Sequence, residues 1–215
     1  MKQIIFGTTN QEKINQIQAA LSRLGIDVIG IGDFPDLPRV EENGTSALEN
    51  AVIKARAYSQ AIGEPVLSMD NALYFEGLPA EEQPGIHVRT FLSEKRLDDE
   101  AAVAKYAEFI RNHGETLNSY WEFGLCIAHP DGRILTKEIK SPRIFTSEAS
   151  ENRIPGYPLE SLQKISVDGP ILADIPAEDK AQFWQDVIGK EVREWFESMP
   201  EFASEIKAET GQKIS

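Results

Sequence analysis

The segment TTNQEK, residues 8–13, stands between a short apolar stretch and a helical pattern. A helix N-terminus presents free backbone N–H groups and a partial positive charge, which together suit a phosphate group. Lys13 lies one turn into this helix, beside its apolar stripe, and could reach the same anion. The segment lacks the glycines and the Gly-Lys-Ser/Thr pattern of a Walker loop. It therefore indicates either a phosphate site or a capped helix with a solvated lysine.

A second polar group lies in EENGTSALENAVIKA, residues 41–55. Asn50 and Lys54 are four residues apart and share one face of a predicted helix. Because that face flanks the apolar stripe, both side chains could line the edge of a cleft. Glu41 and Glu42 precede the helix in a loop. The alternative is a solvated helix face beside an acidic loop.

Asp70 follows the apolar run from Val66 to Met69, which predicts a strand. An isolated buried carboxylate is costly, so Asp70 must be solvated, paired or bound to a metal ion. Ligands of open α/β sheets bind outside the carboxyl ends of strands, where Asp70 is expected. Arg89 alternates with apolar neighbours in PGIHVRTF, residues 84–91, a predicted strand. It could serve a ligand or a salt bridge.

The elements that must position these side chains alternate along the first half of the chain. Thr9 with Glu12, and Ser46 with Glu49, have the spacing of capping boxes at two helix starts. The alternation of strands with helices predicts an α/β unit. The expected elements are strands at residues 2–7, 27–34 and 66–75 and helices at about 10–24 and 46–62.

The second half predicts a region richer in β-structure, followed by a helix. Pro130-Asp131-Gly132 lies between two apolar runs and indicates a hairpin turn. The expected elements are a helix at 97–113, hairpin strands at 119–129 and 133–140, an irregular segment at 143–176 and a final helix at 177–198.

Charge and composition exclude several classes of protein. The net charge of −13 argues against binding of a nucleic acid polymer, which needs a broad basic face. A small anion remains compatible, because it needs only a few local cations or a metal ion. No run approaches the roughly 18 apolar residues of a membrane span, so we expect no membrane partner. The single cysteine, Cys126, predicts a core thiol and favours an intracellular, cytoplasmic protein.

Four segments together resemble the inosine triphosphate pyrophosphatase (RdgB-like) family. They occur in the family's order and with similar gaps, and the match is clear over residues 1–95. The segments are TTNQEK, ENGTSALENAVIKA, PVLSMDNALYFEGL and QPGIHVRTFL. The resemblance implies an α/β fold with a central elongated mixed sheet flanked by helices and a cleft between two lobes. It places one domain over residues 1–215, with lobe one at about 1–80 plus the C-terminal helix and lobe two at about 81–176.

The resemblance also implies an activity. The family binds a purine nucleoside triphosphate and Mg²⁺ in the cleft, as a homodimer, and releases a monophosphate and pyrophosphate from deaminated purine substrates. By position, Glu42 and Asp70 would hold the metal ion. Asp70 and Lys13 would be catalytic, with Asp70 orienting or deprotonating the attacking water. The residues expected to contact the substrate are Thr8, Asn10, Lys13, Asn50, Lys54, Arg89 and Lys180.

The chain also departs from the family pattern. Met69 stands where the family has the first acid of a pair, and we expect it to remove one metal or water contact. Trp184-Gln185-Asp186 stands where the family has a Ser-His-Arg segment that contacts the base. We therefore expect a divergent Mg²⁺-dependent nucleoside triphosphate pyrophosphatase. The alternatives are a nucleotide-binding homologue with little or no turnover, and an enzyme of the same chemistry that acts on another base.

Overall fold

The computed structural model describes residues 2–202, apart from the side chain of Lys180. In this part of the chain the strands form one mixed sheet in the order β2-β1-β3-β4-β5-β6. β1 is parallel to β2 and β3, while β3, β4, β5 and β6 are antiparallel to one another in turn. The strand bounds are β1 Lys2–Phe6, β2 Ile26–Gly30, β3 Val66–Phe75, β4 Thr116–Ala128, β5 Ile134–Thr146 and β6 Gln163–Lys164.

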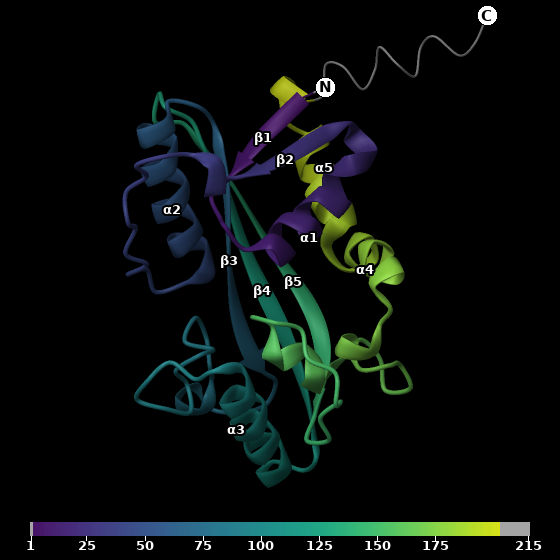
Figure 1. Ribbon diagram of the computed structural model, residues 1–215. Coiled ribbons are helices and arrows are strands. Elements are labelled where there is room, and N and C mark those ends of the chain that lie inside the picture. The colour runs from purple at the N-terminus through teal and green to yellow at the C-terminus, as the bar shows by residue number, and fades with distance from the viewer. Residues whose placement is uncertain (1, 203–215) are drawn as a thin grey trace, which may run out of the picture.

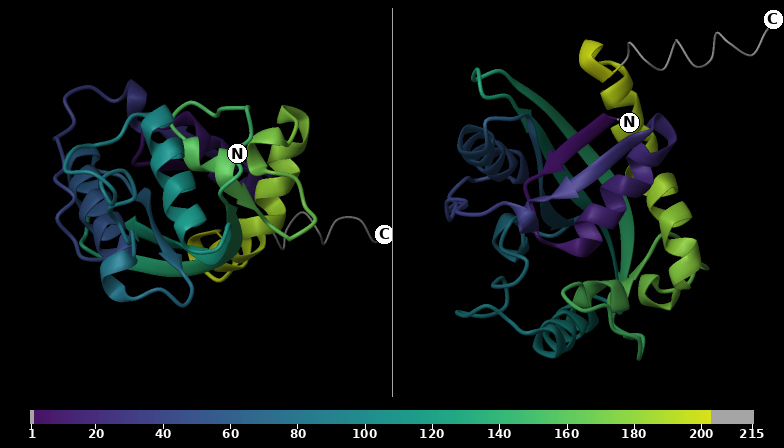
Figure 2. Two further views of the ribbon diagram at one scale, coloured as in Figure 1. Left: turned by 90° about the horizontal axis from the view of Figure 1, so that it is seen from below. Right: turned by 45° about the horizontal axis from the view of Figure 1, so that its top comes forward.

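Helices flank both faces of this elongated sheet, as the sequence predicts. α2 covers one face, and α1 with α4 and α5 covers the other (Figures 1 and 2). α3 lies at the end of β4 and β5 opposite their connecting turn (Figure 1). The helix bounds are α1 Gln11–Leu21, α2 Ala47–Ile62, α3 Asp99–Asn112, α4 Ala177–Trp184 and α5 Lys190–Glu197, with a π-helical turn at Gln185–Gly189.

The side chains of the strand β3 point alternately to the two faces of the sheet. Successive residues of a strand point to opposite faces of the sheet. Leu67 and Met69 therefore share one face, where both belong to the apolar core between the sheet and α1. Asp70 points to the face that α2 covers. The same alternation carries Leu73 and Phe75 into a second apolar cluster around α3.

The caps of α1 and α2 fix where their lysines lie. Asn10, rather than the predicted Thr9, caps α1: its Oδ1 accepts hydrogen bonds from the backbone N–H groups of Glu12 and Lys13 at 3.0 and 3.2 Å. Asparagine is among the strongest N-cap residues, so the helix begins one residue later than expected. The cap predicted for α2 is confirmed, because Ser46 Oγ accepts from Glu49 N at 3.1 Å.

α2 rests directly on β4 at Gly124. A Cβ at this position would lie 2.3 Å from the backbone nitrogen of Leu48 and 2.5 Å from its Cα. Such a distance is far inside van der Waals contact, so only glycine permits this approach. Gly124 is the cross-strand partner of Asp70. The start of α2 is therefore held close to the strand position that carries the carboxylate.

Three local predictions about strands were wrong. Residues 31–33 form a 3₁₀ turn, so the strand expected at 27–34 ends at Gly30. Residues 84–91 form turns, not a strand, because Gly85 has a φ of +53° and makes only an isolated bridge to Leu73. Residues 143–146 belong to β5 instead of an irregular segment, since β4 continues beside them to Thr116. The hairpin and the helix near 97–113 are confirmed, and the final helix is present with a π-helical turn inside it.

Candidate active site

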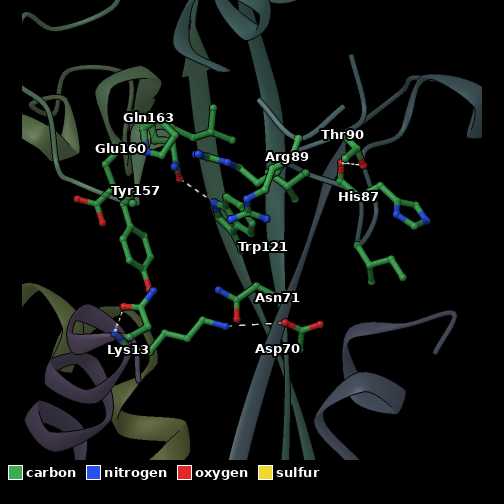
Figure 3. A pocket seen from close by; sticks show the side chains of 17 residues that line it. Lys13, Asp70, Asn71, His87, Arg89, Thr90, Trp121, Tyr157, Glu160 and Gln163 are labelled. Carbon is green, nitrogen blue, oxygen red and sulfur yellow. Dashed lines mark hydrogen bonds and ion pairs between the residues drawn. The ribbon is translucent and has the colours of Figure 1, made fainter. Parts of the chain in front are cut away.

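A cleft of about 360 Å³ opens beside the middle of β3, at Asp70 and Asn71. Its walls come from the start of α1, from β3 and from two irregular segments, 86–96 and 156–163. Figure 3 shows Lys13 and Asp70 at one end of this space, with Trp121, Glu160 and Gln163 toward the other. The cleft therefore joins a charged end to an end lined by aromatic and polar side chains.

Two lysines converge on Asp70 at the charged end. Lys13 Nζ lies 3.8 Å from Asp70 Oδ1, and Lys54 Nζ lies 3.4 Å from the same oxygen. Lys54 Nζ also lies 3.2 Å from Glu42 Oε2. The backbone oxygen of Met69 accepts from both lysines, at 3.3 and 3.5 Å. Lys13, Glu42, Lys54 and Asp70, called the charged cluster below, thus come together from four separate segments.

The ammonium group of Lys13 is held in a desolvated position. Burial, together with the charge of the neighbouring Lys54, lowers the pKa of Lys13 to about 8 against the opposing charges of Asp70 and Glu42. A desolvated ammonium group becomes more favourable when an anion is placed beside it. A phosphate group in the cleft would supply that anion.

The loop before α2 carries Glu42 toward Lys54. Gly44 N donates to Asn50 Oδ1 at 2.9 Å, which ties the loop to the helix. A Cβ on Gly44 would lie 2.8 Å from that oxygen, so the contact depends on glycine. Asn50 is only 3% exposed. Its side chain is thus used in holding the loop, and it does not line the cleft.

The fit of Mg²⁺ depends on the donors in this cluster. Among residues 2–202, apart from the Lys180 side chain, no group of three or more His, Cys, Asp or Glu residues is placed to hold a metal ion. Glu42 and Asp70 are two carboxylates that share Lys54. Mg²⁺ is commonly held by one or two carboxylates, with water and substrate phosphates as the other ligands. The two carboxylates therefore fit Mg²⁺ that arrives with a triphosphate.

The other predicted site residues have different positions. Thr8 Oγ1 accepts from Asn10 N at 3.1 Å, so Thr8 supports the cap of α1. Asn10 lines the cleft but bonds its Oδ1 to the helix start. Arg89 lines the cleft and donates to Asp99 Oδ1 at 2.7 Å, which joins the cleft wall to α3. Lys180 lies in α4, and its side chain is outside the described structure.

Several polar and aromatic residues of the cleft were not predicted as site residues. Trp121 Nε1 donates to Gln163 Oε1 at 2.7 Å, across a separation of 42 residues. Tyr157, whose pKa burial raises, and Glu160 lie beside them. Tyr157 belongs to the segment PGYPLES, residues 155–161, and its aromatic ring is the feature of that segment that could have marked it. Nothing in the local sequence marks Trp121 or Gln163.

A family model described as the Ham1 family matches residues 4–183. The chain belongs to the Ham1 family. This confirms the resemblance to the inosine triphosphate pyrophosphatase (RdgB-like) proteins.

Relatives of this Ham1-family chain match most of its length. A dITP/XTP pyrophosphatase of Geobacillus kaustophilus is 26% identical over 202 residues, which cover 88% of this chain and 97% of that protein. The Ham1 protein of Staphylococcus aureus superposes with a TM-score of 0.68 at 20% identity, covering 97% of this chain and all of that chain. A HAM1 protein of Coxiella burnetii gives 0.70 at 19% identity, over 90% and 98%. These structures confirm the fold.

Within residues 2–202, no helix is both long enough and apolar enough to span a bilayer.

Proposed function

We propose that this Ham1-family chain is a Mg²⁺-dependent enzyme that hydrolyses a nucleoside triphosphate to the monophosphate and pyrophosphate. Its class is a nucleoside triphosphate pyrophosphatase of the hydrolases, as the family and the relatives named dITP/XTP pyrophosphatase indicate. The observation that carries the proposal is the approach of Lys13 and Lys54 to Asp70 at 3.8 and 3.4 Å. Deaminated purine nucleotides are the proposed substrates.

The charged cluster has the groups that this hydrolysis needs. Lys13 and Lys54 would neutralise phosphate oxygens, where charge accumulates in phosphoryl transfer. Mg²⁺ held by Glu42 and Asp70 would neutralise further charge and lower the pKa of bound water. Asp70 would orient the attacking water and accept its proton. As the water oxygen bonds to phosphorus, the P–O bond to the bridging oxygen breaks and pyrophosphate leaves.

A panel of triphosphates with Mg²⁺ tests this proposal, with pyrophosphate release as the readout. We expect release from at least one deaminated purine triphosphate and its loss in Asp70→Asn. Asp168→Asn is the matched control, because Asp168 is exposed and outside the cleft. Absence of release from every triphosphate, at high enzyme concentration, would sink the proposal.

The second candidate is a nucleotide-binding homologue with little or no turnover. One observation favours it. Met69 carries a thioether and no carboxylate, and its side chain is buried in the core and adds nothing to the charged cluster. This candidate predicts nucleotide binding without release of pyrophosphate. Robust Mg²⁺-dependent turnover that is abolished in Asp70→Asn would rule it out.

Three further properties stay predictions. The homodimer and the division into lobes at about residue 80 and residue 176 rest on the resemblance, and the cytoplasmic location rests on the single cysteine. Size-exclusion chromatography with light scattering tests the first of them directly.

A further inference from the structure

Two irregular segments, 86–96 and 156–163, form walls of the cleft. Figure 3 shows Arg89 on one side of the cleft and Tyr157 on the other. The sheet holds both segments at their ends, because Gly85 makes an isolated bridge to β3 just before the first and β6 lies at the end of the second. The distance between the two walls must therefore be set by a further contact.

The side chain of Asp99, the first residue of α3, contacts both walls. Its Oδ1 accepts from Arg89 Nη2 at 2.7 Å, and its Oδ2 accepts from the backbone N–H of Gly156 at 2.8 Å. These two hydrogen bonds are called the Asp99 bridge below. The N–H of Gly156, and then the guanidinium of Arg89, hold the pKa of Asp99 below its usual value. The bridge is therefore made by a charged carboxylate at neutral pH, and such bonds are strong.

Each end of the Asp99 bridge holds a group that lines the cleft. The Nε and Nη1 of Arg89 are buried and have no hydrogen-bond partner among the described residues. Because Asp99 takes Nη2, the guanidinium is oriented by one nitrogen and keeps donors for a ligand. At the other end, Gly156 has a φ of +80° and directly precedes Tyr157. The bridge thus fixes a cation on one wall and an aromatic ring on the other.

The helix that carries Asp99 is itself packed against both segments. Tyr106, in the middle of α3, is 0% exposed, and its hydroxyl donates to the backbone oxygen of Val88 at 2.8 Å. Leu159 of the second segment belongs to the same apolar cluster as Tyr106. Asp99 therefore projects from a support that is already held against the two walls that it joins.

We propose that Asp99 is a positioning residue that sets the distance between the two walls, so that one nucleoside triphosphate contacts both. Asp99 does not line the cleft and acts through Arg89 and the backbone at Gly156. This deepens the proposed function and rests on it, because it adds the residue that prepares the cleft for a long ligand. A cleft held in its binding geometry loses less conformational entropy when the ligand arrives.

Asp99→Asn breaks the Asp99 bridge with little change of shape. An amide has one acceptor oxygen and an NH₂ donor, so it can serve Arg89 or Gly156 but not both. The remaining N–H group then faces another donor. The Asp99 side chain is 35% exposed and lies in the first turn of α3, so the variant should fold. Asp99→Ser, whose shorter side chain cannot reach both walls, gives the same test if it does not.

Asp98→Asn is the matched control. Asp98 is the neighbouring residue, is exposed and lies outside the cleft, and the substitution removes the same charge. Its Oδ1 accepts from Ala101 N at 2.8 Å as the cap of α3. Asparagine caps a helix as well as aspartate does, so this variant should retain both the helix start and the affinity of the cleft.

Calorimetry with two ligands of different length tests the proposal in the presence of Mg²⁺. Tripolyphosphate reaches only the charged end, whereas α,β-methylene inosine triphosphate extends along the cleft and is not hydrolysed. Asp99→Asn should weaken binding of the nucleotide analogue by about tenfold or more and that of tripolyphosphate by about threefold or less. A merely structural effect would reduce the fraction of folded protein and leave both affinities unchanged.

Steady-state kinetics give a second readout on the triphosphate that the chain hydrolyses. Asp99 makes no contact with the charged cluster among the contacts of the described residues. Asp99→Asn should therefore raise KM by about tenfold and leave kcat within about threefold, as expected for lost binding rather than lost chemistry. A fall in kcat with an unchanged KM would overturn the positioning role.

The outcomes separate this inference from the proposed function. Equal losses of affinity for the two ligands, or equal behaviour of Asp99→Asn and Asp98→Asn, would overturn it, as would absence of analogue binding by the unmodified chain. If the analogue binds as expected but no triphosphate is hydrolysed, the proposed function fails and the role of Asp99 stands. If triphosphates are hydrolysed and Asp99→Asn binds the analogue as the unmodified chain does, the inference fails and the proposed function stands.

Discussion

Asp70 lies directly opposite Gly124 in the antiparallel pairing of β3 with β4, and α2 rests on the backbone at Gly124. This contact brings the helix that carries Lys54 against the strand that carries Asp70. Lys54 Nζ then lies 3.4 Å from Asp70 Oδ1. A glycine without catalytic atoms thus determines whether a lysine and a carboxylate can meet.

Gly124→Ala should therefore weaken both stability and activity. The added Cβ would lie 2.3 Å from Leu48 N, so α2 must shift away from the sheet. Overpacking of this kind costs about 1 to 3 kcal/mol of the free energy of unfolding. Urea unfolding and pyrophosphate release measure the two effects. Gly32→Ala is the matched control, because a Cβ on Gly32 meets no atom within 4 Å. Equal behaviour of the two variants would contradict the assigned role of Gly124.

Lys54→Met should change turnover and metal binding in opposite directions. Lys54 contacts Glu42 at 3.2 Å and Asp70 at 3.4 Å, so its ammonium group competes with Mg²⁺ for the same carboxylates. Without it, Mg²⁺ should bind the nucleotide-free protein more tightly. Loss of a cation beside the reacting phosphates should lower kcat/KM by about a hundredfold or more.

Magnesium titration by calorimetry and steady-state kinetics check these two effects of Lys54→Met. Lys190→Met is the control, because the Lys190 side chain is 76% exposed and pairs only with Glu194 of its own helix among the described residues. If metal affinity and turnover both fell together, the shared-carboxylate arrangement would be wrong.

Anion binding at pH 8 should take up protons through Lys13. The pKa of Lys13 is lowered to about 8, so about half of this side chain is uncharged at that pH. A phosphate group raises the pKa of a neighbouring lysine, and the lysine then gains a proton. Calorimetry with pyrophosphate in two buffers of different ionisation enthalpy, without metal ions, gives the number of protons.

The difference between the unmodified chain and Lys13→Met isolates the contribution of this residue, since pyrophosphate itself also titrates. We expect the difference to be about half a proton at pH 8 and to vanish near pH 6, where Lys13 is already charged. An equal proton uptake by both proteins at pH 8 would show that the anion does not reach Lys13.

Two members of the charged cluster could be predicted from the sequence, because helix-start and strand-end patterns place them. Lys13 lies one turn after a helix start, and Asp70 follows an apolar strand, so each position follows from spacing alone. The partners within the cluster could not be derived that way. Lys54 meets Asp70 because α2 packs on Gly124, and a close packing contact between distant segments leaves no periodic signal.

The end of the cleft away from Lys13 and Asp70 lay beyond sequence reasoning for a similar reason. Arg143 follows Pro142 in a stretch rich in turn-forming residues, so β5 was predicted to end before it. The pairing of β5 with β4 extends the strand through Thr146 and places Arg143 on the covered face of the sheet. Trp121 and Gln163 likewise meet through tertiary structure, as their 2.7 Å hydrogen bond shows.

The last prediction concerns Met69, which stands where the family has the first acid of a pair. From the sequence alone, an acid at this position would be expected to strengthen metal binding. Met69 is 2% exposed and belongs to the apolar core on the face of β3 opposite Asp70. A carboxylate there would be buried without a partner, so Met69→Asp should lower the free energy of unfolding by several kcal/mol. It should not reduce the Mg²⁺ concentration needed for activity.

Met69→Leu is the matched control, since a swap of similar volume in a core costs less than about 1.5 kcal/mol. Urea unfolding compares the two variants, and a Mg²⁺ titration of activity follows on whichever remains folded. If Met69→Asp proved as stable as Met69→Leu and needed less Mg²⁺, the new carboxylate would have reached the charged cluster. The strand would then have to turn its side chains, which the pairing of Asp70 with Gly124 opposes.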